Sequence, residues 1–199
     1  ATAHTFAVTA PRRSAGAPAV EVDRPLVITG REGQFCAGFD LAVMGGGDRA
    51  AVSALFGDGG RLFADMLAAP VPVVAACTGH ALAGGALLLL SADYRVGTVG
   101  AYKIGLNEVR IGLALPRSAL VIARHRLSTR HLTAATLLAE VGTPDRSVEA
   151  GYLDDVATDA VAAARTAAAQ FGELPRRAFS VTKRRLREAI LAELADCDS

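Results

Sequence analysis

The sequence predicts a helix-rich fold of the α/β or α+β class. Half of the 199 residues are hydrophobic, aromatic residues are few and Trp is absent. Short β-branched runs alternate with longer apolar stretches of helical period. The clearest example lies at residues 71–76, Val-Pro-Val-Val-Ala-Ala, which predicts a buried strand and precedes a glycine pair and an unbroken apolar run. The length suits one domain with a full core.

The strands are expected where short apolar or alternating runs end at glycine or a polar residue. These runs lie at residues 4–9, 25–30, 71–76, 93–97 and 102–106, with a turn and a short strand over 148–156. Residues 10–22 have no clear period and predict a loop. Residues 31–41 are rich in small residues and predict a second loop.

The helices are expected where apolar residues recur at helical spacing. Such stretches lie at residues 50–69, 84–90, 116–126, 129–140, 159–171 and 175–194. The first is expected to be interrupted by the glycines at 57–60 and to end at Pro70, and Gly45 to Gly47 before it predict a flexible break. Pro116 suits the first turn of its helix.

The stretch at residues 77–90 is the centre of the predicted site. Gly84 and Gly85 stand at the helix start, where glycine lets the backbone approach a ligand and the first amides have no helical partner. Those amides suit an anion, or a carbonyl oxygen that becomes anionic during a reaction. A tightly packed junction without a ligand is the alternative, since glycine-rich turns are common in α/β folds.

Charge and cysteine content narrow the classes of function. The net charge of +1 gives no electrostatic argument for a nucleic acid or an anionic membrane as partner. Cys36, Cys77 and Cys197 are scattered, without a Cys-x-x-Cys pair, which indicates a reducing compartment. There is no signal-peptide pattern, and the run at residues 87–90 is too short to span a bilayer. We therefore expect a cytoplasmic protein without a membrane partner.

Few side chains suggest chemistry of their own. Glu108 stands among apolar residues and glycines. If it is buried, its pKa rises and it becomes a usable acid or base; an exposed loop carboxylate is the alternative. Cys36 has no identifiable base, so a small buried thiol is favoured over a nucleophile. The histidines lack metal-ligand spacing, so no metal site is expected, and His125 and His131 are assigned to helix surfaces.

Four common catalytic and nucleotide-binding motifs are absent. The sequence has no Gly-x-Ser-x-Gly elbow, no P-loop and no His-Glu-x-x-His. Residues 79–85 do not match Gly-x-Gly-x-x-Gly, so a Rossmann-type oxidoreductase is a distant alternative.

Two glycine-rich loops that follow strands, with a glutamate after them, resemble the crotonase (enoyl-CoA hydratase/isomerase) superfamily. The matching segments are residues 27–30, 35–41, 79–85, 104–112 and 149–154, and the resemblance covers about residues 25–194. It implies a single domain with a spiral of ββα units over about residues 1–140. A C-terminal helical region over about 141–199 would mediate packing into a homotrimer or a dimer of trimers.

The resemblance also implies an acyl-CoA thioester substrate and no cofactor beyond the coenzyme A that the substrate carries. The backbone amides of Ala37 and Gly84 correspond to those that bind the thioester oxygen and stabilise an enolate. Glu108 corresponds to the catalytic base. Further substrate contacts are expected from Cys36, Gly38, Phe39, Asp40, His80, Gly85, Leu87 and Lys183.

Two departures from the family pattern bear on the reaction. Family hydratases use two glutamates, and Leu87 stands at the place of the first. One base is enough for proton transfer along an enolate, and the segment 104–108 resembles that of Δ3,Δ2-enoyl-CoA isomerases. Isomerisation is therefore predicted. The alternatives are a hydratase in which another residue replaces the missing glutamate and a non-catalytic acyl-CoA-binding protein.

The second departure is the short chain before the strand at 25–30. Family members usually carry an amphipathic helix and part of the coenzyme A site there, which residues 10–22 do not supply. Either this segment is short or residues are missing from the sequence. The basic run at 183–187 is expected either to meet the phosphates of coenzyme A or to form a solvated helix face.

Overall fold

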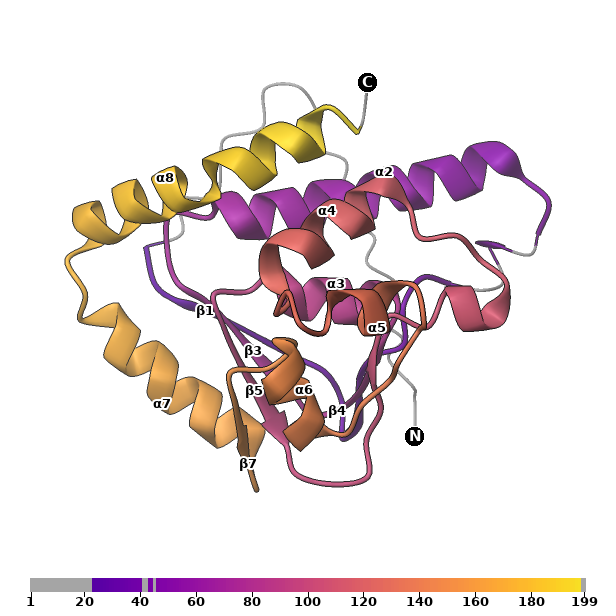
Figure 1. Cartoon of the computed structure of the whole chain (residues 1–199). Coiled ribbons are helices and arrows are strands. Elements are labelled where there is room, and N and C mark those ends of the chain that lie inside the picture. Colours follow the sequence, from indigo (N-terminus) through magenta and orange to yellow (C-terminus); the bar gives the residue numbers. More distant parts are fainter. Residues whose placement is uncertain (1–22, 41–42, 45, 198–199) are drawn as a thin grey trace.

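The structure is a computed structural model of the chain, and it describes residues 23–40, 43–44 and 46–197. The strand expected at 4–9 and the loop at 10–22 lie outside the described residues. Figure 1 shows two parallel sheets with helices around them, and α2 and α8 lying side by side.

Two all-parallel sheets form the centre of the fold. The larger has the order β1-β3-β5-β7 and consists of β1 (Leu26–Thr29), β3 (Val73–Cys77), β5 (Tyr94–Thr98) and β7 (Asp155–Ala157). The smaller has the order β2-β4-β6 and consists of β2 (Gly33–Cys36), β4 (Gly79–Leu82) and β6 (Ile104–Gly105). Successive strands alternate between the sheets, which confirms the predicted α/β class and the spiral of ββα units.

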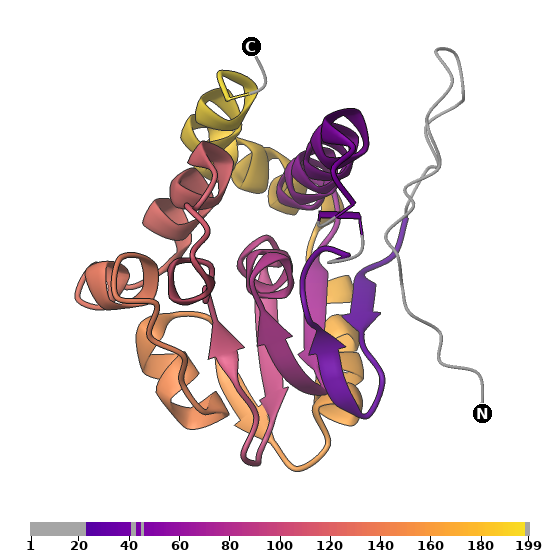
Figure 2. The ribbon, with the colours of Figure 1, turned by 90° about the vertical axis from the view of Figure 1, so that its right-hand side faces the viewer.

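Helices follow the strand pairs in the spiral. They are α2 (Arg49–Ala68), α3 (Gly84–Leu90), the 3-10 helix η1 (Val109–Ile111), α4 (Arg117–Arg126), α5 (Leu132–Thr136), α6 (Pro144–Ala150), α7 (Ala160–Gly172) and α8 (Arg176–Ala195). Figure 2 shows α2, α4 and α8 together above the strands. None of the helices in the described part of the chain is long and apolar enough to cross a membrane.

The larger sheet is covered on both faces because its side chains alternate. Val74 and Ala76 face α7, whose buried residues are alanines, so helix and sheet approach closely. Val73 and Ala75 point to the opposite face and join the main core with α2 and α3. Since both faces are buried, β3 reads as a continuous apolar run, which is typical of parallel sheets.

Several expected elements were wrong in detail. The strand at 25–30 is an edge strand rather than a buried one, and Leu26 is 39% exposed. The expected loop at 31–41 contains β2, and β4 lies between β3 and α3. The helix expected at 129–140 is confined to α5, and α6 replaces the turn expected near residue 148.

Helix α2 runs without interruption through the glycines at 57–60, contrary to the prediction. Asp48 caps its start by accepting from the amides of Ala50 and Ala51. Gly59 is buried, and a Cβ atom there would lie 2.5 Å from Cζ of Phe39. The glycine that weakens the helix by propensity is thus required by packing, and it admits the Phe39 ring.

Candidate active site

The three candidate functional segments leave the smaller sheet at one edge. The strands β2, β4 and β6 are parallel, with Cys36 paired to Ala81 and Leu82 paired to Gly105. The chain therefore leaves all three strands on the same side, which is where open parallel sheets bind ligands. The segments containing Ala37, Gly84 and Glu108 follow at that edge.

The first two segments touch each other through their backbones. A Cβ atom at Gly38 would lie 3.4 Å from the amide nitrogen of Gly84, and one at Gly85 would lie 2.1 Å from the carbonyl oxygen of Cys36. Gly38 has φ +98°, which glycine adopts without strain. Glycine at positions 38 and 85 is therefore a requirement of the close contact.

The amides of Ala37 and Gly84 have no acceptor among the described residues. The hydrogen bonds that start α3 come from the later amides of Ala86 and Leu87, which both donate to the carbonyl of Ala83, at 2.9 and 3.2 Å. Two open backbone donors thus lie on touching segments. This arrangement can hold an oxygen that gains negative charge.

Ala83 carries backbone strain at the start of α3. Its φ is +52° and its ψ −122°, in a region that residues with a side chain rarely occupy. Its own amide donates to the carbonyl of Gly105 at 3.1 Å, which extends the pairing of β4 with β6 beyond their ends. The strained residue sets the direction of the Gly84 amide that follows it.

Glu108 is buried, with 9% of its surface exposed. Its backbone carbonyl accepts from the amides of Ile111 and Leu113, at 3.0 and 2.9 Å, so the residue is held at the start of η1. Its Oε2 atom is buried and lacks a hydrogen-bond partner among the described residues. Burial raises the pKa of the carboxyl, as the sequence predicted for a buried glutamate.

The remaining predicted contact residues divide by location. Cys36, Gly38, Phe39 and Gly85 lie at the junction of the two loops; the Phe39 ring packs edge-on against Phe56, with centroids 5.1 Å apart. Cys36 is half-buried rather than buried. Asp40 is exposed at the end of the first loop. Leu87 is 4% exposed and belongs to the main core.

His80 has structural contacts of its own. Its Nδ1 accepts from the backbone amide of Lys103 at 2.9 Å, and its ring packs edge-on against Tyr102, with centroids 5.5 Å apart. These contacts hold the turn before β6. Of the other histidines, His125 is exposed and pairs with Glu193 between α4 and α8.

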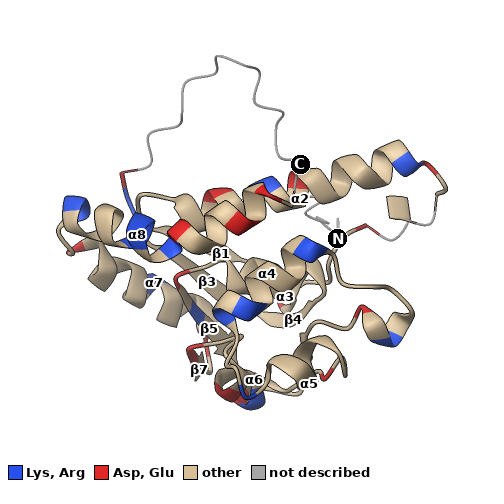
Figure 3. Ribbon diagram, turned by 45° about the horizontal axis from the view of Figure 1, so that its top comes forward, with Lys and Arg blue, Asp and Glu red and all other residues tan. Residues whose placement is uncertain are grey.

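Lys183, which we expected to meet the substrate, is buried. It is 5% exposed, and its Nζ atom is 2.5 Å from Asp93 Oδ2 and 3.1 Å from the carbonyl oxygen of Met66. Burial lowers the pKa of the ammonium, and Asp93 opposes this shift. Since Arg187 is also buried beside Asp93, the basic run is not a solvated face at these two positions. Figure 3 shows the Lys and Arg residues of α8.

Three buried or half-buried cations, Lys183, Arg126 and Arg95, donate hydrogen bonds to carbonyl groups at helix ends. Lys183 donates to the last turn of α2, Arg126 donates to the carbonyl of Leu90 at the end of α3, and Arg95 donates to Gly151 at the end of α6. Helix C-termini carry partial negative charge and favour cations. This cluster is therefore a structural one that joins α8 to the core.

A set of apolar side chains is exposed beside Glu108, and we call it the apolar surface. Its members are Val109, Ile111, Leu113, Leu137 and Leu138, which are 40% to 68% exposed. Arg110 joins the two segments by donating to the carbonyl of Ala139 at 3.2 Å. Exposed apolar surface of this kind marks interaction sites in many proteins.

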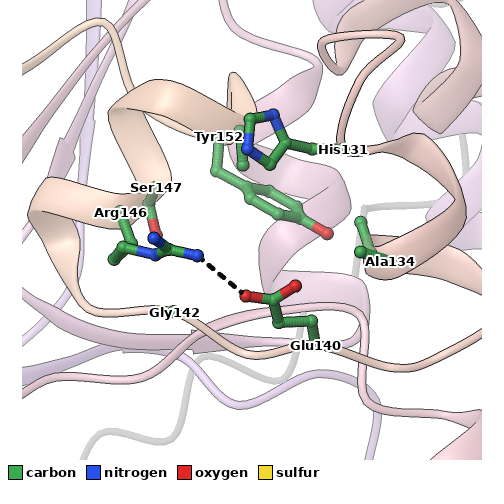
Figure 4. Close-up of a pocket in the computed structure, with 9 residues that line it drawn as sticks. His131, Ala134, Glu140, Gly142, Arg146, Ser147 and Tyr152 are labelled. Atoms are coloured by element: carbon green, nitrogen blue, oxygen red, sulfur yellow. Dashed lines mark hydrogen bonds and ion pairs between the residues drawn. The ribbon is translucent and has the colours of Figure 1, made fainter.

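Tyr152 is a residue that the sequence analysis missed. Its hydroxyl accepts from the amide of Leu106 at 3.3 Å, close to Glu108 in the chain. It also lines a small cavity with His131, Ala134, Ala135, Glu140, Gly142, Arg146, Ser147 and Ala150 (Figure 4). No local signal marked it, because its partner lies far away in the sequence. His131 thus borders a cavity, with its Nδ1 atom buried, instead of lying free on a helix surface.

No metal site is visible in the part of the chain that the structure describes. Residues 23–40, 43–44 and 46–197 contain no group of three or more His, Cys, Asp or Glu side chains placed to hold an ion.

A spiral of ββα units, here with two open amides and a buried glutamate at one edge of the smaller sheet, is the crotonase fold. Residues 19–196 match the model of the enoyl-CoA hydratase/isomerase family. The chain belongs to this family, which confirms the resemblance found in the sequence.

Similar proteins are named as enoyl-CoA isomerases, as enoyl-CoA hydratases, or as both. The human mitochondrial enoyl-CoA delta isomerase 1 is 29% identical over 175 residues, which cover 86% of this chain and 58% of that protein. A solved enoyl-CoA hydratase/isomerase family protein from Pseudomonas syringae has a TM-score of 0.84 and 38% identity, covering 86% of this chain and 75% of that one. An enoyl-CoA hydratase from Mycobacterium ulcerans has a TM-score of 0.84 and 36% identity, covering 87% and 77%.

The chain spans little more than half the length of its curated relatives. The matched parts cover 58%, 59% and 55% of the human, rat and Arabidopsis isomerases.

Proposed function

We propose that the chain shifts the double bond of a 3-enoyl-CoA to the 2-position, with Glu108 as the single proton carrier. Glu108 takes a proton from C2 and returns it to C4. The amides of Ala37 and Gly84 hold the thioester oxygen while it carries the charge of the enolate. No cofactor is needed beyond the coenzyme A of the substrate.

The buried carboxylate oxygen of Glu108, unpaired among the described residues, is the observation that carries this proposal. A buried carboxylate oxygen without a partner has an unmet capacity to accept a proton or hydrogen bond. Burial raises its pKa, which makes the carboxylate a stronger base than an exposed glutamate. It follows β6, and the other two strands of the same sheet, β2 and β4, lead to the two open amides. A proton acceptor and an oxyanion site are the two parts that enolate chemistry needs.

The open amides supply the larger part of the expected stabilisation. Removing one donor from such a site typically costs about 3–4 kcal/mol of transition-state stabilisation. Because both donors at Ala37 and Gly84 are backbone groups, they depend on the contact between Gly38, Gly85 and their neighbours rather than on side-chain chemistry.

Leu87 favours isomerisation over hydration. It lies one helical turn after Gly84 in α3, and its alkyl side chain cannot hold or activate a water molecule. The name of the human relative, enoyl-CoA delta isomerase 1, supports the same choice.

Hydration remains the second candidate because a similar solved structure is named an enoyl-CoA hydratase. In that case another group takes the place of the carboxylate absent at Leu87. Leu87→Glu is then expected to raise hydration of 2-enoyl-CoA, although the change introduces a charge into the core and lowers stability.

The proposal is tested by supplying trans-3-enoyl-CoA and trans-2-enoyl-CoA to the purified protein and to Glu108→Gln. We expect conversion of the 3-enoyl substrate, reduced about 100-fold or more in the variant, since general acid–base catalysis contributes about 10²–10⁴. Hydration of the 2-enoyl substrate by the unmodified chain would favour the second candidate. Tight acyl-CoA binding that Glu108→Gln does not change, without turnover, would leave a binding protein.

We further propose that the chain assembles as a homotrimer or a dimer of trimers and acts in the cytoplasm. The apolar surface beside Glu108 supports an oligomer, because a second copy would remove Ile111 and Leu138 from water. Light scattering of the purified chain measures the assembly. The human and Arabidopsis relatives are named as mitochondrial and peroxisomal.

A further inference from the structure

The segment that carries Glu108 depends on a hydrogen bond from a distant side chain. The ladder of β6 ends at Gly105, whose carbonyl accepts from Ala83. The next amide, that of the buried Leu106, has no sheet partner and donates to the Tyr152 hydroxyl at 3.3 Å. A buried amide without an acceptor is destabilising, because it has lost its hydrogen bonds to water. The bond therefore fixes the backbone two residues before Glu108.

Tyr152 is itself held firmly. It is 2% exposed, and its amide donates to the carbonyl of Ser147 at 2.8 Å. Two residues later, Asp154 accepts from Nε and Nη2 of Arg95 at 2.8 and 2.7 Å, while Arg95 Nη1 donates to the carbonyl of Gly151 at 2.7 Å. Since Arg95 belongs to β5, the tyrosine connects the larger sheet to the Glu108 segment of the smaller one.

The surroundings keep the Tyr152 hydroxyl protonated. Burial raises its pKa, and the negative charges of Glu108 and Glu140 raise it further. The phenol is therefore neutral near pH 7 and can accept from Leu106. The cavity beside it has a volume of about 20 Å³, room for about one water molecule, and no room for a metabolite. Figure 4 shows the Tyr152 ring between His131 and Glu140 at this cavity.

We propose that Tyr152 is a positioning residue for Glu108 and acts through the amide of Leu106. It does not touch the substrate. It holds the end of β6 so that the carboxylate keeps its buried position at the sheet edge. The inference rests on the proposed function for its kinetic consequence, but the effect on position is measurable without turnover.

The test is Tyr152→Phe, which removes the hydroxyl and keeps the ring. Tyr94→Phe is the matched control, because Tyr94 lies in β5 with its ring against Phe171 and away from Glu108. With 3-enoyl-CoA, we expect Tyr152→Phe to lower kcat at least tenfold, since a displacement of about 1 Å can cost about 100-fold. KM is expected to stay the same, because the open amides are unchanged.

Two further measurements do not need turnover. Hydrogen exchange at the Leu106 amide is expected to be faster in Tyr152→Phe, because its acceptor is lost. The carboxyl of Glu108, followed by carbon-13 NMR, is expected to titrate at lower pH than in the unmodified chain, because a loosened segment admits water. Neither change is expected in Tyr94→Phe.

The outcomes separate this inference from the proposed function. If the unmodified chain shows no isomerisation, the proposed function fails, while exchange and titration still decide the role of Tyr152. If Tyr152→Phe matches Tyr94→Phe in kcat, Leu106 exchange and Glu108 titration, the inference is overturned. A lower melting temperature with unchanged exchange and titration marks a purely structural residue and also overturns it.

Discussion

Replacing Asp93 with Asn is expected to destabilise the chain strongly, because it leaves two buried cations without their counter-charge. Asp93 lies 2.5 Å from Lys183 Nζ and 3.5 Å from Arg187 Nη2, and these cations are 5% and 7% exposed. Removing one partner of a buried pair costs about 3–5 kcal/mol. We place the loss at about 4–5 kcal/mol, because Arg187 Nε already lacks a partner among the described residues and Arg126 adds like charge nearby.

Asp93→Asn tests the negative charge of Asp93 separately from the size and the hydrogen bonding of its side chain. Asp93 Oδ2 also accepts from the amide of Val73 at 3.0 Å. The side-chain oxygen of Asn can accept the same bond, and Asn has nearly the same size. What the variant loses is the negative charge beside Lys183 and Arg187.

The assay is denaturant unfolding at pH 7, followed by circular dichroism. Asp58→Asn is the matched control, since Asp58 pairs with Arg61 on the surface of α2, where the side chains are 30% and 65% exposed. Such a pair contributes about 0–1 kcal/mol. If Asp93→Asn loses no more free energy of unfolding than Asp58→Asn, the buried cluster does not stabilise α8 and the reasoning is wrong.

Three further predictions follow from the same geometry. Lys183→Met is expected to leave acyl-CoA affinity unchanged in calorimetry, because the ammonium is buried against Asp93; a loss of affinity would restore the predicted phosphate contact. Gly85→Ala is expected to reduce kcat sharply, because its Cβ atom would lie 2.1 Å from the carbonyl oxygen of Cys36. Its control is Gly60→Ala in α2, where a Cβ atom has nothing within 4 Å; this change is expected to leave kcat unchanged and to raise stability by about 0.5–1 kcal/mol. Similar kcat values for the two variants would contradict the prediction. Burial raises the pKa of Glu108, and the carboxylate form is the proposed base. We therefore expect kcat to fall as the pH drops through a pKa above that of an ordinary glutamate. In a pH–rate profile, Glu108→Gln is expected to lack this fall in kcat at low pH.

The pH dependence of stability has the opposite sign. A carboxyl with a raised folded pKa contributes stability that is present at low pH and is lost as pH rises through that value. Glu108→Gln is therefore expected to unfold with a flatter pH dependence above the ordinary glutamate range, and with higher stability near neutral pH. Thermal melts of both proteins across pH measure this. An unchanged slope would mean that Glu108 is not buried as the structure describes.

The sequence alone predicted the parts of the site that rest on local backbone rules. Gly84 and Gly85 at a helix start, and an apolar strand before them, are local signals, and the structure has both. The strands β2 and β4 were missed because each is only four residues long and begins with a glycine, which has low strand propensity. Their pairing comes from the spiral, which a local pattern does not encode.

Burial was predicted less well than secondary structure. Lys183 and Arg187 looked like substrate contacts or a solvated face because their counter-charge, Asp93, lies far away in the chain. Gly59 looked like a helix break because the Phe39 ring that it admits comes from another element. In both cases a tertiary partner reversed what the residue type favours. The roles of Ala37, Gly84 and Glu108 stay predictions until turnover is measured.

The alternation of strands between two sheets has a consequence for how the chain acquires its site. Each pass along the spiral adds one strand to each sheet, so β2, β4 and β6 come from three successive passes. The sheet edge that presents both amides and the glutamate exists only after the third pass has docked. Pairings this far apart in sequence make folding slow, because loop closure precedes the contacts that reward it. During synthesis, the emerging chain therefore carries both open amides, those of Ala37 and Gly84, before it carries Glu108.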